Sequence, residues 1–374
     1  MENKGGRNQL GKIIKHEFLK IFTSKLFLYT LIVFILANIV LLIYTQNIAK
    51  KDEIPYSAYK ILNEEIKDLS ELEKQELISK EYEKNNAFSI ISNIVNNKNS
   101  DDAYIREFAE TLKNENKELY DKYINEYPTG GYKYTGDEAK ELAFLKEIKR
   151  EYEECKNYKQ IISEILEKAE NLETISIFQE AQDDFSNKNI KDTAQNYEKM
   201  LDTELEFIPA KGINSFTKMG ITDILIVLLI FVISTIIIYE EREKNLFPLI
   251  KSTKNGRGKT ILAKIFVMFI LIFAISLILY SINFIYYAIT IGYGNLSANL
   301  QSINTFLYST LPISIGGYIA LFFITKIAVF FIISLIILLI SNLAKNNVSN
   351  YIALILIFGI SFLRIYNNRS NFKI

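Results

Sequence analysis

Long runs of uncharged, apolar residues constrain this 374-residue chain more than any other feature. Three of them are 26–44, 224–239 and 265–287, and the second is extended outward through Asp223 and Thr222. They define the predicted spans 26–46, 220–239 and 265–289. A bilayer core about 30 Å thick needs roughly 20 apolar helical residues, so we expect each segment to cross a membrane. The first run is too long, and starts too far along the chain, to be a signal peptide. The chain is therefore expected to be an all-α membrane protein.

Residues 47–219, between the first and second spans, have the composition of a helical domain. They are rich in Glu, Lys, Leu, Ile and Tyr, and they contain no apolar run of membrane length. Apolar residues between 137 and 172 recur at steps of three or four, which predicts one long helix with Cys155 on its buried face. Residues 57–85 predict a second long helix, and the acidic run 151–154 is expected on a solvated face.

Basic residues beside the spans set the expected orientation. Residues 1–25 contain six Lys and Arg, residues 240–264 contain seven, and residues 292–312 contain none. Since flanking Lys and Arg favour the cytoplasmic side, we expect the N-terminus and 240–264 inside the cell. The large block 47–219 and the loop 290–312 are then expected outside.

The formal net charge of zero conceals this asymmetry. Residues 47–219 carry 25 Lys+Arg and 37 Asp+Glu, which leaves 18 basic and 6 acidic residues in the rest of the chain. An acidic external domain thus cancels a basic membrane part whose charges lie mostly inside. The balance also argues against a polybasic nucleic-acid binder.

Residues 311–343 form an ambiguous stretch, because Lys326 interrupts the apolar run. We favour a single span over 313–343 with an interfacial start, since two spans hinged at 325–326 would each be too short. A charge one-third of the way down such a helix costs about 2.5–3.5 kcal/mol unless it snorkels or is paired. Lys326 is expected either to snorkel to the outer interface or to line a polar path.

Residues 349–366 are expected to be a fifth span. The tail 367–374 would then lie outside, although the end of the chain is basic, contrary to the charge rule. Six spans with a cytoplasmic C-terminus would remove this conflict. A chain that is truncated before a final helix would also remove it.

Residues that could carry catalysis are scarce. One Cys and one His exclude a disulfide framework within the chain and the paired histidines of common zinc sites. Residues 258–260, Gly-Lys-Thr, match the end of a phosphate-binding loop, but Thr253 occupies the position of its first Gly and no strand precedes it. We predict no catalytic, metal or cofactor site and do not expect an enzyme.

Two cytoplasmic segments carry more information. Apolar side chains trace one face of residues 10–22 and lysines occupy the rest, which predicts an amphipathic helix at the membrane surface. Residues 240–264 begin with charged residues that extend the second helix beyond the membrane. A short apolar surface follows at 246–250 before Asn255-Gly256 turns the chain back. Exposed apolar residues of this kind more often mark a docking site than a simple connection.

The order of these elements resembles the permease subunit of type-2 ATP-binding-cassette (ABC) transporters, the ABC-2 family, from low-GC Gram-positive bacteria. That family typically has a pattern E-[KR]-x-x-G-x-x-x-L-x-x-[ST] where the second span leaves the membrane. Glu243 and Lys244 match its first positions, Phe247 stands where Gly is usual, and Leu249 or Ile250 follows. A basic residue and a Lys, here Arg257 and Lys264, then lead into the third span.

The resemblance implies a non-catalytic subunit of the bacterial plasma membrane that pairs with separate ABC ATPase subunits. Two permease copies, identical or different, would form the translocation path, and the cargo would be a peptide or a lipid. The N-terminal helix and residues 240–264 would transmit ATPase closure to the spans. The expected coupling residues are Glu17, Phe18, Glu243, Lys244, Phe247, Leu249 and Arg257, and Lys326 is the candidate polar residue within the membrane.

The alternative is a membrane-anchored sensor or envelope scaffold that uses the helices of 47–219 to dock another protein. Such a protein needs no ATPase, and its membrane part would be a passive anchor. Five or six spans exceed what an anchor requires, so the permease is the favoured interpretation.

Overall fold

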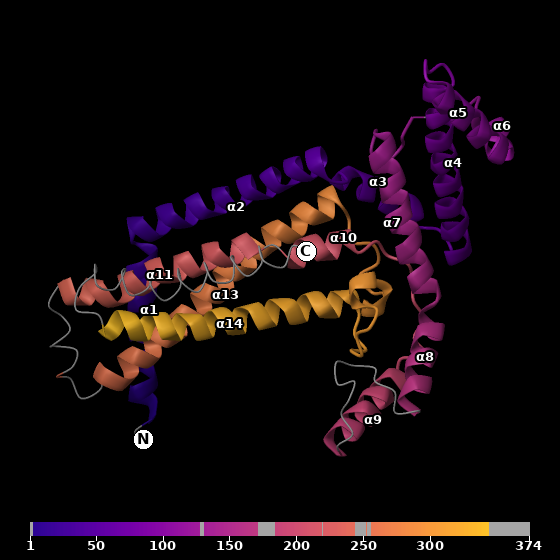
Figure 1. The fold of residues 1–374 in the computed structure, drawn as a ribbon. Helices are drawn as coiled ribbons and strands as arrows, with labels where there is room; N and C mark the ends of the chain where they lie inside the picture. Colours follow the sequence, from indigo (N-terminus) through magenta and orange to yellow (C-terminus); the bar gives the residue numbers. More distant parts are fainter. Residues whose placement is uncertain are drawn as a thin grey trace. The chain divides into compact units, whose positions relative to one another are not determined.

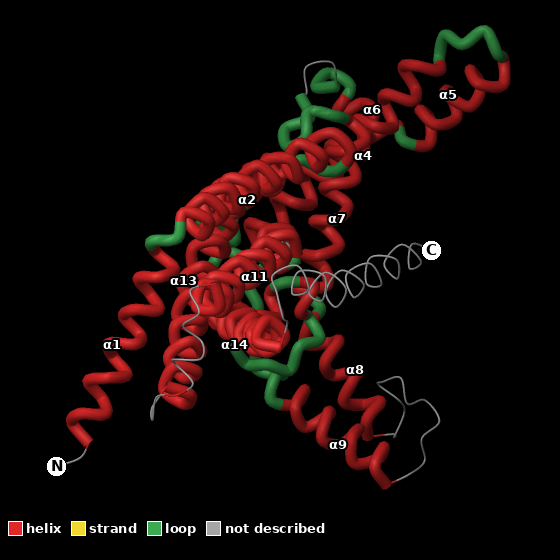
Figure 2. The backbone as a smooth tube through the Cα atoms, turned by 90° about the vertical axis from the view of Figure 1, so that its left-hand side faces the viewer, coloured by secondary structure: helices red, strands yellow, loops and turns green. Residues whose placement is uncertain are grey.

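The computed structural model describes residues 3–127, 131–170, 184–218, 220–243, 252 and 256–343. The secondary structure of this part of the chain is helical, apart from an isolated β-bridge between Asn299 and Ser314 (Figures 1 and 2). This confirms the all-α prediction for the described residues. The chain divides into two compact units.

The first unit, here called the membrane unit, comprises Met1–Leu42, Met219–Phe284 and Leu321–Ile374. The second, here called the insertion unit, comprises Ile43–Lys218 and Ile285–Ala320. The insertion unit therefore joins the predicted external block to the predicted external loop, two segments that are distant in the sequence.

Four helices of the described chain are long and apolar enough to cross a membrane: α2 (Lys25–Asp52), α11 (Gly220–Glu243), α13 (Gly256–Thr290) and α14 (Ile315–Leu343). They correspond to the first four predicted spans. The structure shows α14 as one uninterrupted helix, without a hinge at 325–326. The predicted fifth span, 349–366, and the tail lie outside the described residues.

Helices extend further than the apolar runs from which they were predicted. α2 continues to Asp52, into the segment assigned to the external block. α11 continues to Glu243 and α13 already begins at Gly256, so the predicted loop 240–264 is helical at both ends. Backbone hydrogen bonding does not stop at the membrane edge, and charged residues such as Glu, Lys and Arg are good helix formers in water.

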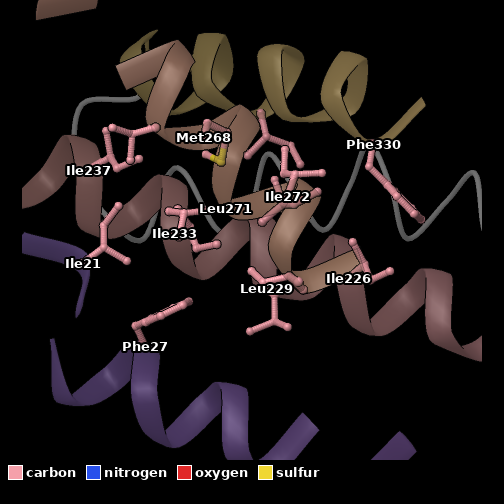
Figure 3. Packing of buried hydrophobic residues seen from close by; sticks show 14 of the residues in the cluster. Ile21, Phe27, Ile226, Leu229, Ile233, Ile237, Met268, Leu271, Ile272 and Phe330 are labelled. Carbon is pink, nitrogen blue, oxygen red and sulfur yellow. The ribbon is translucent and has the colours of Figure 1, made fainter. Parts of the chain in front are cut away.

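The core of the membrane unit is built from apolar side chains of α1 (Asn3–Phe22) and the four long helices (Figure 3). Ile21 of α1 and Phe27 of α2 pack with the buried faces of α11, α13 and α14. The labelled members of this cluster in Figure 3 are Ile21, Phe27, Ile226, Leu229, Ile233, Ile237, Met268, Leu271, Ile272 and Phe330. Lipid tails are as apolar as these side chains, so close packing rather than water exclusion favours association of the spans.

Eight helices lie wholly within the described residues of the insertion unit. They are α3 (Tyr56–Ile66), α4 (Glu71–Asn97), α5 (Ala103–Glu115), α6 (Lys117–Tyr123), α7 (Glu138–Lys156), α8 (Tyr158–Glu170), α9 (Asp184–Glu198) and α10 (Lys211–Thr217). α4 packs against α5, α6 and α7, and α8 packs against α9. Two 3₁₀ turns, η1 (Leu300–Ser302) and η2 (Asn304–Phe306), lie within the predicted loop 290–312.

Both long helices predicted for this unit are interrupted. The 57–85 prediction is wrong because a new helix starts after Ser70, whose Oγ accepts the Glu73 amide while Glu73 Oε2 accepts the Ser70 amide at 2.8 Å. This reciprocal capping box satisfies amides that a helix start leaves free. The 137–172 prediction is wrong at Asn157, which ends α7 before α8 begins. Apolar periodicity continues across both breaks, so it could not detect them.

The acidic run 151–154 is not wholly solvated as predicted. Glu151 is buried, and its Oε2 accepts the amide hydrogen of Ala210 at 3.3 Å. Burial raises the pKa of Glu151 to about 7, although the Ala210 hydrogen bond acts in the opposite direction. Cys155 is buried on the apolar stripe of α7, as predicted.

We predict that Glu151 makes the stability of the insertion unit depend on pH. A carboxyl whose pKa is higher in the folded state holds its proton more tightly there, so stability falls as pH rises from 4.5 to about 7 and is flat above. The loss is at most about 3 kcal/mol. Chemical unfolding of the full chain in detergent should show this slope, and Glu151→Gln should remove most of it.

The matched control is Glu153→Gln, which changes an exposed carboxylate on the same helix. It should leave the slope intact. An equal flattening by both substitutions would show that burial of Glu151 is not its cause.

Candidate functional site

A cluster of four charged side chains joins α1, α11 and α13 in the membrane unit. Lys20 Nζ lies 2.7 Å from Glu17 Oε2 and 3.2 Å from Glu241 Oε1, and Lys264 Nζ lies 2.6 Å from Glu241 Oε2. Both ammonium groups also donate to the carbonyl oxygen of Ile237 at 3.0 Å. All four side chains are largely shielded from solvent, and their formal charges sum to zero. We call this group the charge cluster.

The two carboxylates of the charge cluster are unequal. Burial raises the pKa of Glu17, because it outweighs the attraction of Lys20 and Lys264. Burial also acts to raise the pKa of Glu241, but Lys264 and Lys20 together hold it below its usual value. Glu241 is therefore the firmly ionised centre of the cluster, since both lysines bind it directly.

A ring of three uncharged side chains connects α2, α11 and α13. Asn38 Nδ2 donates to Asn283 Oδ1 at 2.7 Å, Asn283 Nδ2 donates to Thr222 Oγ1 at 2.7 Å, and Thr222 Oγ1 donates to Asn38 Oδ1 at 2.8 Å. All three side chains are buried within predicted spans. Because the bilayer core offers no water, polar groups at this depth are stabilised by bonding to one another.

Next to Thr222 in the sequence, Asp223 binds side chains from two other helices. Tyr280 of α13 donates its hydroxyl to Asp223 Oδ1, and Lys326 of α14 forms an ion pair with Asp223 Oδ2. The Lys326 ammonium also lies 5.4 Å from the centre of the Phe322 ring. This group links α11, α13 and α14.

The predicted coupling residues are only partly within the described structure. Glu17 belongs to the charge cluster, and Phe18 packs against the apolar core. Glu243 is the last residue of α11 and Arg257 lies in the first turn of α13, but the described structure does not include their side chains. The positions of Lys244, Phe247 and Leu249 lie outside the described residues.

Lys326 satisfies its charge by pairing, and its partner Asp223 was not identified from the sequence. The other members of the three groups that were not predicted as site residues are Lys20, Asn38, Thr222, Glu241, Lys264, Tyr280 and Asn283. A signal for some of them exists in the sequence, because Asn and Asp are rare inside apolar runs and usually have a partner there. Nothing in the sequence states which helices bring those partners together.

The insertion unit contains a cavity of about 430 Å³ with a mixed lining. Lys60, Asn63 and Glu206 contribute polar groups, and Phe207 and Ile291 contribute apolar surface. The buried Lys74 also lines this cavity. Its Nζ lies 3.3 Å from Glu206 Oε1 and 2.8 Å from Glu71 Oε1.

The long apolar helices and their buried polar contacts define a multi-pass α-helical membrane protein. Residues 24–367 match the sequence profile of the ABC-2 family transporter proteins, and the chain belongs to that family. Comparison with curated proteins and with solved structures gave no match. Family membership makes the chain a permease component of an ABC transporter, which implies an ABC ATPase partner. Subunits of this family are typically non-catalytic.

We predict that Asn38→Leu destabilises the membrane unit by about 1–2 kcal/mol, because two polar groups of the ring lose a partner inside the membrane. Unfolding of the purified full chain in mixed micelles measures this loss. Val40→Leu, on the lipid-exposed side of the same helix, is the control and should have little effect. Equal stability of the two variants would contradict a stabilising role for the ring.

Proposed function

We propose that this chain is the transmembrane subunit of an ABC exporter and is driven by separate ATPase subunits. Two permease copies form the translocation path in a bacterial plasma membrane. The observation that carries the coupling part of this proposal is the charge cluster, which ties the amphipathic helix α1 to α11 and α13.

The charge cluster supports transmission of force from α1 to the spans. Breaking one partner out of a buried ion pair costs about 3–5 kcal/mol, because a charge is then left unpaired. When an ATPase moves α1, movement of α11 and α13 together with α1 costs less free energy than breaking the ion pairs between them. Glu17 and Phe18 lie on α1, next to this junction, and the segment that contains Glu243, Lys244, Phe247, Leu249 and Arg257 is proposed as the second ATPase contact.

The insertion unit is proposed to lie outside the cell, with the N-terminus in the cytoplasm. The low content of Lys and Arg in 292–312 and their abundance in 1–25 and 240–264 support this orientation. Residues 43–218 and 285–320 also form one compact unit, as expected for segments on the same side of the membrane. Its mixed cavity is a candidate contact for a peptide or lipid cargo.

For the coupling step, we predict that the double substitution Glu17→Gln with Lys20→Met lowers ATP hydrolysis by the reconstituted complex about tenfold. That loss corresponds to about 1.4 kcal/mol of coupling. The two changes together preserve the net charge and leave the Glu241–Lys264 pair intact, so they sever α1 without creating an excess buried charge. Hydrolysis is measured with the permease and ATPase purified together.

Lys15→Met is the control, because Lys15 lies on the exposed side of α1. It should hydrolyse ATP at the rate of the unmodified complex. Full activity of the double variant would show that the charge cluster does not couple the subunits. Failure of the unmodified chain to bind any ATPase would refute the exporter itself.

The orientation is tested with single thiols in a Cys155→Ser background. Tyr104→Cys on exposed α5 should react with a membrane-impermeant maleimide in intact cells, whereas Lys12→Cys on α1 should react only after lysis. The reverse pattern would place the insertion unit in the cytoplasm.

A further inference from the structure

The Asp223–Lys326 ion pair is not sealed inside the helix bundle. The side chain of Asp223 remains 29% exposed and that of Lys326 remains 26% exposed. Both residues belong to helices that are long and apolar enough to cross a membrane. Charged groups at such depths almost always face the interior of a bundle or a water-filled cavity, because lipid tails cannot solvate them.

Asp223 and Lys326 differ in how many of their hydrogen-bonding atoms have a partner. Asp223 uses both carboxylate oxygens, one for Tyr280 and one for Lys326. An ammonium group has three donors, and among the described residues Lys326 directs a hydrogen bond to Asp223 alone, beside its contact with the Phe322 ring. Because its side chain is partly exposed, the Lys326 ammonium can also donate to water or to an oxygen acceptor brought by another molecule.

The pair lies toward the ends of the spans that connect to the insertion unit. Asp223 is in the first turn of α11, directly after that unit, and Lys326 is eleven residues from the start of α14. Eleven residues of helix rise about 16 Å. Tyr280 lies ten residues before the end of α13. The partly exposed charges thus lie toward the ends of the spans that are proposed to face outward.

We propose that Asp223 and Lys326 line a water-filled passage through the bundle and that Lys326 receives an anionic oxygen group, a phosphate or a carboxylate, of the transported molecule. This inference rests on the proposed export function and names the chemistry of its cargo. The ammonium exchanges Asp223 for the incoming group, so it keeps an anionic partner throughout. Tyr280 continues to donate to Asp223 while Lys326 is occupied, which stabilises the released carboxylate.

The test uses thiol reactivity, since Cys155 is the sole cysteine of the chain and is replaced by Ser. Val329→Cys places a thiol one helical turn beyond Lys326, at a site that is 45% exposed. Ile324→Cys is the matched control on the opposite side of the same helix, where the native side chain is 65% exposed. Both are treated with anionic and cationic membrane-impermeant thiosulfonates in lipid nanodiscs.

We expect the thiol at 329 to react and the thiol at 324 to remain unreactive, although position 324 is geometrically more exposed. Adding Asp223→Asn should raise the ratio of anionic to cationic reaction rates about fivefold, because Lys326 then lacks its counter-charge. Adding Lys326→Gln should lower the ratio by a similar factor. The double variant Asp223→Asn with Lys326→Gln should restore an intermediate rate ratio. It is the control for effects of a single unpaired charge, because both charges are removed.

Two further arms identify the source of the anionic group. Slowing of the anionic reagent at position 329 by phosphatidylglycerol, relative to phosphatidylcholine alone, supports a lipid headgroup. Slowing by inorganic phosphate in phosphatidylcholine nanodiscs supports a soluble anion. If neither slows the reagent, Lys326 does not receive such a group and the inference is wrong.

An unreactive thiol at 329 in variants that elute as folded protein would also overturn the inference, because the pair would then be a dry contact or covered by a second copy. An unchanged rate ratio in all charge variants would do the same. Thiol labelling tests the role of Lys326 and requires no ATPase. Failure of the chain to bind an ATPase would instead reject the proposed exporter function, so the two failures can be told apart.

Discussion

A polar or charged side chain that is shielded from water needs a partner within the protein, and this constraint organises the membrane unit. Three polar groups satisfy it, and α11 takes part in each. Glu241 of α11 holds the two lysines of the charge cluster, Thr222 completes the ring with two asparagines, and Asp223 binds Tyr280 and Lys326. Of the four long helices α11 is also the most buried, with 61% of its apolar window covered against 39% for the next. Its neighbours are thus arranged around one central helix.

The central position of α11 gives the proposed coupling a physical route. Asp223 and Glu241 are eighteen residues apart on one continuous helix, a rise of about 27 Å. A helix of this length transmits displacement well when side chains hold it at both ends. In the proposed exporter, α1 acts on the end with Glu241, and the displacement appears at the end with Thr222 and Asp223. The exposed charges on Lys326 and Asp223 would then change their surroundings during each cycle.

Much of the fold was predictable because long hydrophobic runs report directly on a membrane environment. The four described spans, the amphipathic N-terminal helix and the buried position of Cys155 all followed from patterns within short windows of sequence. The errors in the insertion unit have one cause. Periodicity records which residues face a core, and it continues across Ser70 and Asn157, where one helix is separated from the next. Glu151 was assigned to solvent because its buried contact, with the Ala210 amide, comes from a residue far away in the sequence.

The sequence by itself determined that this protein is helical, that it crosses a membrane several times and that its charge is divided between two regions. It also contained the rare intramembrane residues Asn38, Asp223 and Lys326, and the cost of an isolated charge predicted that Lys326 needs a special environment. Only the tertiary structure decided that Lys326 pairs with Asp223 and that Asn38 closes a ring with Asn283. These partners are separated by 103 and 245 positions. A hydrogen bond over such a distance depends on how whole helices pack, which no local pattern of residues records.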